Sequence, residues 1–341
     1  MATHTRPLGR AFLGALLFVS LIVQGFAVIG AAYQMQLGNP SNATTTTSNH
    51  VNYLIQRDQY AMDYNDTLRV ANWVSWNLTS GDVGGSGRSS FAVDPDLPAS
   101  FTIVGTGDYS GSGYDRGHMC PSADRTVSVA DNKIVFYMTN MVPQAPDNNQ
   151  GVWASFETEC RNIAAQGNEV LITSGPSGFS GSTIASGVSI PGYVWKIVVV
   201  VPLNGRDPTV DLAPNHIDAN TRVIAIKIPN IQGVRNDPWQ NYITSVAQIE
   251  ADTGYTFFDN LPPAVAAALR VKIDGQTSAG LPVIVTQPSS QTAGLGGNAA
   301  FSVTVTSDTT VTYQWNKDDV PLGSGMAVDR IDANTRVIAI K

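Results

Sequence analysis

The chain has 341 residues, of which 43% are hydrophobic and 14% are charged, so it is long enough and apolar enough to form one large globular domain and a smaller one. Its formal net charge is −7, which argues against a broad basic face of the kind that binds polyanions. A protein of this composition that acts on nucleic acid must do so through a local basic groove.

Residues 1–32 have the pattern of a secretory signal peptide. Arg6 and Arg10 precede an uncharged apolar run that extends from Ala11 to Ala32 and ends in small residues. The alternative is an uncleaved membrane anchor, since about 20 apolar residues are enough to span a bilayer. The pattern favours cleavage and export, which predicts a secreted protein, extracellular or periplasmic, without stable membrane association.

The two cysteines, Cys120 and Cys160, leave two interpretations open. They are too few for a zinc site, because no histidines stand at ligand spacing beside them. In an oxidising compartment they are able to form a disulfide. The alternative is a pair of buried free thiols.

A polar arm over residues 33–50 precedes the predicted domain, residues 51–272. Period-2 alternation or short apolar runs predict several strands in this domain. These are residues 53–55, 71–76, 101–104, 134–139, 170–173, 194–201 and 221–228. The run 194–201 is almost continuously apolar and is therefore expected at the centre of a sheet.

Helical periodicity begins at about Asn149. Val152, Phe156, Cys160 and Ile163 fall on one face of a helix that is expected to stop at Gly167. Shorter helices are expected within residues 238–249 and 261–269. Strands and helices without regular βαβ repeats predict an α+β fold with a central, mostly antiparallel sheet.

The sequence changes character after the predicted domain. Residues 273–281 read as a linker, and residues 282–325 resemble the first strands of an immunoglobulin-like sandwich that is too short to close. The tail, residues 326–341, contains an unchanged copy of residues 217–227. Because old duplications diverge, the copy indicates a recent or artefactual join, and we expect the region after about residue 282 to fold poorly in isolation.

The candidate chemistry starts in the string Asp115-Arg116-Gly117-His118. An imidazole accepts a proton near neutral pH, and a guanidinium has the shape to bind a phosphate. A histidine in such a string is more often structural than catalytic when nothing else accompanies it. Its companions here are Asn149, which opens the predicted helix, and Glu157, two turns further on, which are expected to face one cleft.

The combined pattern resembles the DNA/RNA non-specific endonuclease family, which includes mitochondrial endonuclease G and belongs to the ββα-metal (His-Me finger) nucleases. The resemblance rests on the Asp115–His118 string, on Asn140-Met-Val-Pro-Gln144, and on Asn149-Gln-Gly-Val-Trp153 followed by Glu157. It covers residues 50–268, and its order and spacing both match.

The resemblance implies a base and a metal site. His118 would be the general base that takes a proton from the attacking water. Asn149 would be the one direct protein ligand of Mg²⁺, with Mn²⁺ or another divalent cation as the alternative, and Glu157 would hold the ion through water. Asn140 would help to orient the site.

The resemblance also implies two phosphate-binding arginines. Arg116 would contact the phosphate, and Arg88 would stabilise the charged transition state. Arg125, by contrast, is interpreted as a structural ion-pair partner. Since contacts to phosphate and sugar carry no sequence information, DNA and RNA would both be substrates, without sequence specificity.

The sequence therefore predicts a secreted, Mg²⁺-dependent, non-specific endonuclease. Two alternatives remain. One is a secreted binding protein that keeps the fold without activity and uses the immunoglobulin-like segment. The other is a phosphodiesterase that acts on another phosphate ester.

Overall fold

A seven-stranded antiparallel sheet organises the larger part of the protein, as a computed structural model shows. The structure describes residues 33–275 without a break, followed by residues 283–286, 289, 291–294, 301–306, 314–317, 320–321 and 337–340. The strands are, in sheet order, β1 (Tyr53–Gln56), β2 (Ala61–Asn65), β3 (Val70–Leu78), β6 (Asn168–Ser177), β7 (Tyr193–Pro202), β8 (Arg222–Pro229) and β9 (Ile243–Thr244). The predicted α+β class with a mostly antiparallel sheet is confirmed.

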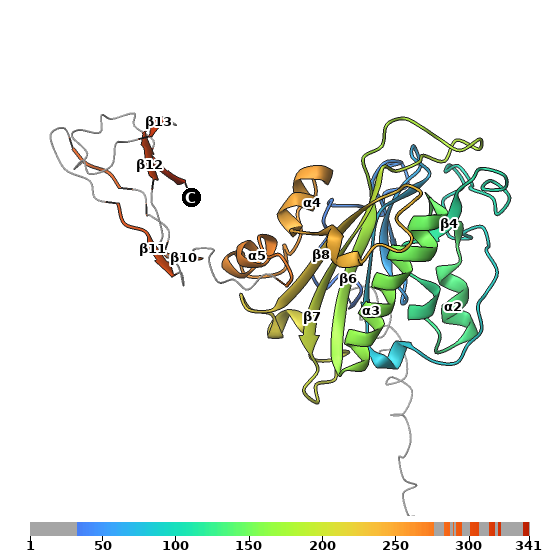
Figure 1. The fold of residues 1–341 in the computed structure, drawn as a ribbon, viewed down its shortest axis with the longest axis horizontal. Helices are drawn as coiled ribbons and strands as arrows, with labels where there is room; N and C mark the ends of the chain where they lie inside the picture. The colour runs from blue at the N-terminus through green and yellow to red at the C-terminus, as the bar shows by residue number, and fades with distance from the viewer. Residues whose placement is uncertain are drawn as a thin grey trace, which may run out of the picture. The chain divides into compact units, whose positions relative to one another are not determined.

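Helices cover both faces of this sheet (Figure 1). One face carries α2 (Val129–Val135) and α3 (Ala154–Ala165), and the other carries α4 (Val246–Thr253) and α5 (Pro263–Arg270). Short 3₁₀ turns lie in the connections between the strands and helices, at Ser80–Asp82, Ser122–Asp124, Met138–Asn140, Ala213–His216 and Trp239–Tyr242.

Strand β7 contributes side chains to a core on each face of the sheet. Val194 and Val198 belong to the core on the α3 side, whereas Trp195 and Ile197 belong to the core on the other side. Because side chains alternate across a strand, a strand covered on both faces reads as a continuous apolar run. The predicted central position of residues 194–201 is confirmed.

The predicted strand at residues 134–139 is wrong. The segment is the end of α2 followed by a 3₁₀ turn, and the Ser128 hydroxyl caps α2 by accepting a hydrogen bond from the Asp131 amide at 3.0 Å. Phe136 and Met138 are 0% and 2% exposed. The apolar run therefore reflects a buried helix end and not a strand.

The predicted strand at residues 101–104 is also wrong, because this segment has no ladder partner in the sheet. Phe101 is buried instead by aromatic rings. Its ring stacks on His50 at a centroid distance of 4.4 Å and lies 4.9 Å from the ring of Tyr53. Loop packing buries Phe101 and Val104 and leaves Ile103 exposed, so the apolar pattern here does not mark a strand.

The polar segment 33–50 is packed into the domain rather than standing before it as an arm. Gln36 is 6% exposed and donates from Nε2 to Glu169 Oε1 at 3.1 Å. Gln34 accepts a hydrogen bond from the backbone amide of Asn77 at 2.9 Å. These buried polar contacts extend the packed domain to the first described residues.

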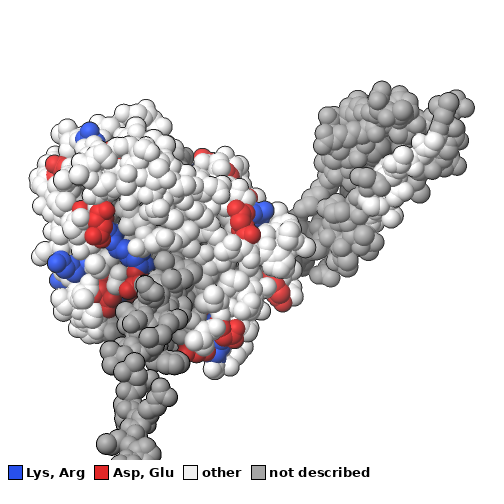
Figure 2. Space-filling view, turned by 180° about the vertical axis from the view of Figure 1, so that it is seen from behind, with Lys and Arg blue, Asp and Glu red and all other residues white. Residues whose placement is uncertain are grey.

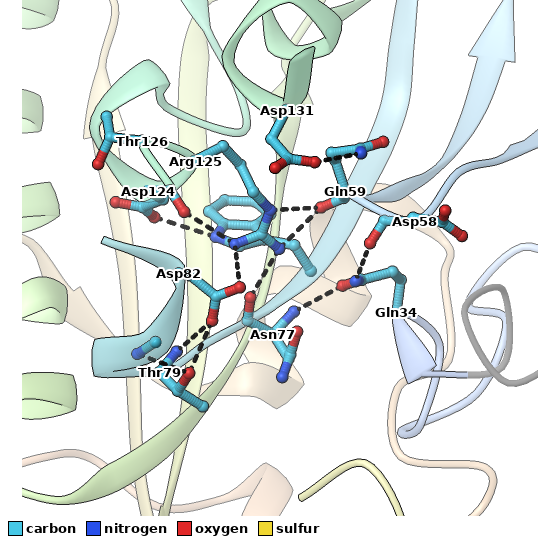
Figure 3. A network of polar contacts seen from close by, with 12 residues as sticks. Gln34, Asp58, Gln59, Asn77, Thr79, Asp82, Asp124, Arg125, Thr126 and Asp131 are labelled. Atoms are coloured by element: carbon cyan, nitrogen blue, oxygen red, sulfur yellow. Dashed lines mark hydrogen bonds and ion pairs between the residues drawn. The ribbon is translucent and has the colours of Figure 1, made fainter. Parts of the chain in front are cut away.

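Arg125 is the centre of a buried polar network (Figure 3). Its guanidinium is 4% exposed and donates to the backbone carbonyls of Gln59, Asn77 and Asp124 at 2.8–3.0 Å. The carboxylate of Asp82 lies 3.5 Å away. The interpretation of Arg125 as a structural residue is confirmed.

Cys120 and Cys160 are both buried free thiols, which contradicts the disulfide hypothesis. Burial raises the pKa of Cys160 to about 12 and that of Cys120 still further. Thiols of this kind stay protonated and unreactive at neutral pH.

Residues 275–341 form a second unit. Its described strands are β10 (Val283–Thr286), β11 (Thr304–Thr306), β12 (Gln314–Lys317), β13 (Val320–Pro321) and β14 (Val337–Ile340). β10 pairs with β11, and β12 pairs with both β13 and β14, all antiparallel. The immunoglobulin-like assignment stays a prediction.

The predicted signal peptide, residues 1–32, lies outside the described residues, as do most of the linker and much of the tail. Among the helices that the structure describes, none has the length and apolar character that a membrane span requires.

Replacing Asp63 by asparagine should stabilise the protein more at pH 8 than at pH 5. Asp63 is fully buried, accepts hydrogen bonds from Ser41 and Asn72 on one oxygen, and has a second oxygen without a partner, so burial raises its pKa from 3.8 to about 7. Because the folded-state pKa is raised, the stabilising contribution is present below pH 4 and is lost as the pH rises through 7.

The gain from Asp63→Asn should therefore be larger at pH 8 by about 2 kcal/mol, measured by urea unfolding at the two pH values. Equal gains at both values would show that the Asp63 carboxyl ionises as easily in the folded as in the unfolded protein.

Candidate active site

A β-hairpin followed by a helix carries the candidate catalytic residues. β4 (Asp115–His118) pairs antiparallel with β5 (Met141–Gln144), with His118 opposite Met141. A wide helical turn, η4 (Asn148–Trp153), follows β5 and leads directly into α3. The three elements together form the predicted ββα unit on one face of the sheet.

The ββα unit borders an open cleft of about 430 Å³. Its lining residues are Arg88, Phe91, Asp115, Arg116, His118, Pro121, Ser122, Ala123, Asn149, Gln150, Ala154 and Glu157. All of the predicted site residues except Asn140 are among them. The cleft therefore brings together residues that are up to about seventy positions apart in the sequence.

His118 is a buried, neutral base at this cleft. The residue is 8% exposed, and its ring packs against Phe136 and Phe91 at centroid distances of 4.7 and 5.6 Å. Nε2 is buried without a hydrogen-bond partner. Burial, and secondarily the charge of Arg88, lowers the pKa of His118 to about 3, so the imidazole is unprotonated at neutral pH.

A carboxylate on β4 orients the side chain of Asn149. Its Nδ2 donates to Asp115 Oδ2 at 2.9 Å, and Gln150 Nε2 donates to the same oxygen at 2.7 Å. With the amide nitrogen engaged, the oxygen of Asn149 is the atom that is left to bind a cation.

Glu157 faces the same cleft from the first turn of α3. Burial raises its pKa to about 7, although Lys196, with Nζ 3.7 Å from Oε1, opposes this shift. Together with the Asn149 amide and the Asp115 carboxylate, Glu157 gives the cleft an all-oxygen donor set, which suits a hard divalent cation.

Few protein ligands would hold such a cation. Within the part of the chain that the structure describes, no group of three or more His, Cys, Asp or Glu side chains is placed to hold a metal ion. An ion bound at Asn149 would thus keep most of its water, as Mg²⁺ does in many sites.

Arg116 and Arg88 are held by aromatic rings rather than by carboxylates. Arg116 lies 4.2 Å from the centroid of Phe91 and donates to the Thr106 carbonyl at 2.9 Å. Arg88 lies 5.0 Å from the centroid of Phe136. Among residues 33–275, no acidic group lies within 4 Å of either guanidinium, so both charges remain available to a phosphate.

One face of the protein carries no broad basic field. On the face shown in Figure 2, Lys and Arg side chains lie scattered among Asp and Glu and do not form one continuous basic field.

Asn140 does not line the cleft and lies behind the base, which agrees with the expectation that it orients the site. It is fully buried, and its side chain bonds both the amide and the carbonyl of Cys120, at 3.0 and 2.9 Å, and the carbonyl of Val135 at 2.8 Å. These bonds fix the backbone two residues after His118.

Sequence reasoning missed Phe91, Gln150 and Lys196, and gave Asp115 no role. Phe91 holds an arginine, Asp115 orients Asn149, and Lys196 pairs with Glu157. Of these residues, only Lys196 stands out in the sequence, as a lone lysine inside the apolar run of β7.

The straight helix predicted from Asn149 is interrupted at Gly151, whose φ and ψ are −112° and −108°. The 230–236 loop presses against this kink, so that a Cβ on Gly151 would lie 2.4 Å from the carbonyl oxygen of Arg235 and 2.5 Å from its Cα. Asn149 and Glu157 thus reach one cleft across a bend.

Gly151→Ala should lower the rate of DNA cleavage by about 10²-fold, because the clash is with backbone and must shift the turn that carries Asn149. Gly85→Ala is the matched control, since a Cβ there meets no atom within 4 Å. The initial rate of plasmid nicking measures both, and similar rates for the two variants would show that the turn tolerates the displacement.

A buried histidine, two arginines without acidic partners among residues 33–275 and several oxygen donors on a ββα unit fit the fold class of the ββα-metal nucleases. The sequence profile of the DNA/RNA non-specific endonuclease family matches residues 37–264, and the chain belongs to this family. It is thus a nuclease, a hydrolase that acts on phosphodiester bonds.

Known relatives and a solved structure agree with this membership. A nuclease of Nostoc sp. (strain PCC 7120) is 45% identical over 239 residues, which cover 70% of this chain and 85% of the relative. Nuclease C1 of Cunninghamella echinulata is 30% identical over 244 residues, covering 67% and 88%. The crystal structure of the EndoG/EndoGI complex matches in fold, with a TM-score of 0.54 at 22% identity over 68% of this chain and 93% of the other.

Proposed function

We propose that the protein is a Mg²⁺-dependent endonuclease that cleaves DNA and RNA without sequence specificity, with His118 as the general base. The observation that carries the proposal is the cleft in which His118, Asn149 and Glu157 meet beside two arginines that have no acidic partner among residues 33–275.

Each group has a separate part in phosphodiester hydrolysis. His118 takes the proton of the attacking water, and Arg116 and Arg88 neutralise charge on the phosphoryl oxygens. Asn149 and Glu157 hold the cation, which when bound supplies further charge neutralisation and assists departure of the leaving oxygen. Because these groups address phosphate, the base sequence has little influence on the rate.

A plasmid-nicking assay with Mg²⁺, with Mn²⁺ and with EDTA tests the proposal, and a parallel assay uses single-stranded RNA. We expect nicking of plasmid and cleavage of RNA with either metal, and loss of both with EDTA. Cleavage that persists in EDTA would reject the metal site. Binding of DNA without cleavage under any divalent cation would favour an inactive binding protein. Hydrolysis of small phosphodiesters alone would favour a phosphodiesterase that acts on another phosphate ester.

We also propose that the protein is exported, on the strength of the basic and apolar pattern of residues 1–32. Expression in a secreting bacterial host, followed by mass spectrometry of the mature N-terminus, tests this. Retention of the full N-terminus in the membrane fraction would favour the anchor interpretation instead.

A further inference from the structure

Lys196 is an almost completely buried charge beneath the cleft. It lies in β7 and is 1% exposed. Its neighbours at two-residue spacing, Val194 and Val198, pack in the core on the α3 side, so the lysine enters the same layer. Burial of an ammonium costs a large desolvation penalty, which only favourable partners offset, so the groups around Lys196 indicate its role.

One carboxylate and two indole rings surround the ammonium. Nζ lies 3.7 Å from Oε1 of Glu157, which is the one acidic group within 4 Å among the described residues. It also lies 4.3 Å from the ring centroid of Trp153 and 5.3 Å from that of Trp76. Desolvated cation–π contacts of this kind fix the position of the cation.

Both indoles are tied to the segment that carries the catalytic base. Trp153 directs Nε1 to the carbonyl of His118 at 3.4 Å, and Trp76 donates from Nε1 to Asp124 Oδ2 at 3.0 Å. Lys196 thus occupies the layer that joins β7, the β4 hairpin and α3.

We propose that Lys196 is a positioning residue for the divalent cation. Its ammonium holds one carboxylate oxygen of Glu157 at the sheet, which leaves the other oxygen for the water shell of an ion bound at Asn149. The inference rests on the proposed metal dependence. It adds that the affinity for the ion depends on a lysine that does not itself line the cleft.

Mn²⁺ binding without substrate, followed by electron paramagnetic resonance, tests the inference. Lys196→Met, which keeps the length and apolar stem, should weaken Mn²⁺ binding at least tenfold. Lys227→Met is the matched control: this lysine in β8 also combines an ion pair, 2.6 Å from Asp252, with a ring contact, 4.2 Å from Tyr193, and should leave the affinity unchanged.

A double-mutant cycle separates positioning from general destabilisation. In a Glu157→Gln background, Lys196→Met should cause no further loss of Mn²⁺ affinity if Lys196 acts through Glu157, whereas equal losses in both backgrounds would overturn the inference. If Lys196→Met does not fold, Lys196→Arg tests the same inference. The larger planar group of arginine displaces the charge between the indoles and should weaken Mn²⁺ binding severalfold. Wild-type affinity for Mn²⁺ would contradict the inference.

Failure of the inference is distinguishable from failure of the proposed function. If the parent protein binds no Mn²⁺, the metal dependence itself is wrong. If the parent binds Mn²⁺, Asn149→Ala abolishes the binding and Lys196→Met leaves it intact, only the role of Lys196 is overturned.

Discussion

Replacing His118 by alanine should lower the rate of plasmid cleavage by about 10³-fold, because the variant lacks the group that takes the proton of the attacking water. The folded structure should survive, since the ring packs at the cleft rather than in the centre of the core. His216→Ala is the control: this histidine is exposed and pairs with Asp211 outside the cleft, and its loss should not change the rate.

The base should also stay unprotonated far below the usual pKa of histidine. Burial and the charge of Arg88 lower the pKa of His118 to about 3, so the neutral, proton-accepting form persists as the pH falls from 8 to 5. NMR titration of the histidine ring protons measures this directly, with the His118 resonance identified by its absence from the alanine variant.

Each of the two measurements tests a different claim about His118. A rate for His118→Ala within tenfold of the parent would reject His118 as the base. A His118 resonance that titrates near pH 6.5 would leave the base in place but would show that the cleft is wetter than its packing against Phe136 and Phe91 indicates.

The sequence predicted the parts of the fold that local periodicity controls. The strand at residues 194–201 and the stop of α3 before Gly167, whose φ is +86°, both follow from patterns a few residues long. The strand predictions at residues 101–104 and 134–139 were wrong because most of the apolar side chains there, such as Phe101 and Phe136, are buried by loops and a helix end, whereas Ile103 is exposed. Such burial produces the same pattern as a strand, and only the long-range partner distinguishes the two.

The candidate site was predictable to the extent that a spaced motif defined it. His118, Asn149 and Glu157 lie where the pattern indicated, on one cleft. The motif carried no information on the groups that hold them, because Phe91, which lines the cleft, and Lys196, which pairs with Glu157 beneath it, lie on elements distant in the chain. Gly151 belongs to the motif, but the need for glycine there comes from the close approach of the 230–236 loop, which only the structure shows.

Replacing Arg116 by alanine should lower kcat/KM about 10²-fold, since a preorganised donor to the phosphate is lost. The stacking of Arg116 on Phe91 and its bond to the Thr106 carbonyl hold the guanidinium at the cleft before substrate arrives. Arg116→Lys should recover only part of the loss, because an ammonium keeps the charge but lacks the planar stacking face and the paired donors.

The salt dependence of DNA binding gives a second, independent measurement of the same contact. In a protein of net charge −7, few arginines face the phosphates, so the slope of log K against log salt should be shallow. Arg116→Ala should reduce this slope by about one, whereas Arg222→Ala, at an exposed arginine paired with Asp274, should leave it unchanged. A steep slope in the parent that Arg116→Ala leaves unaltered would show that the main phosphate contacts lie outside this cleft.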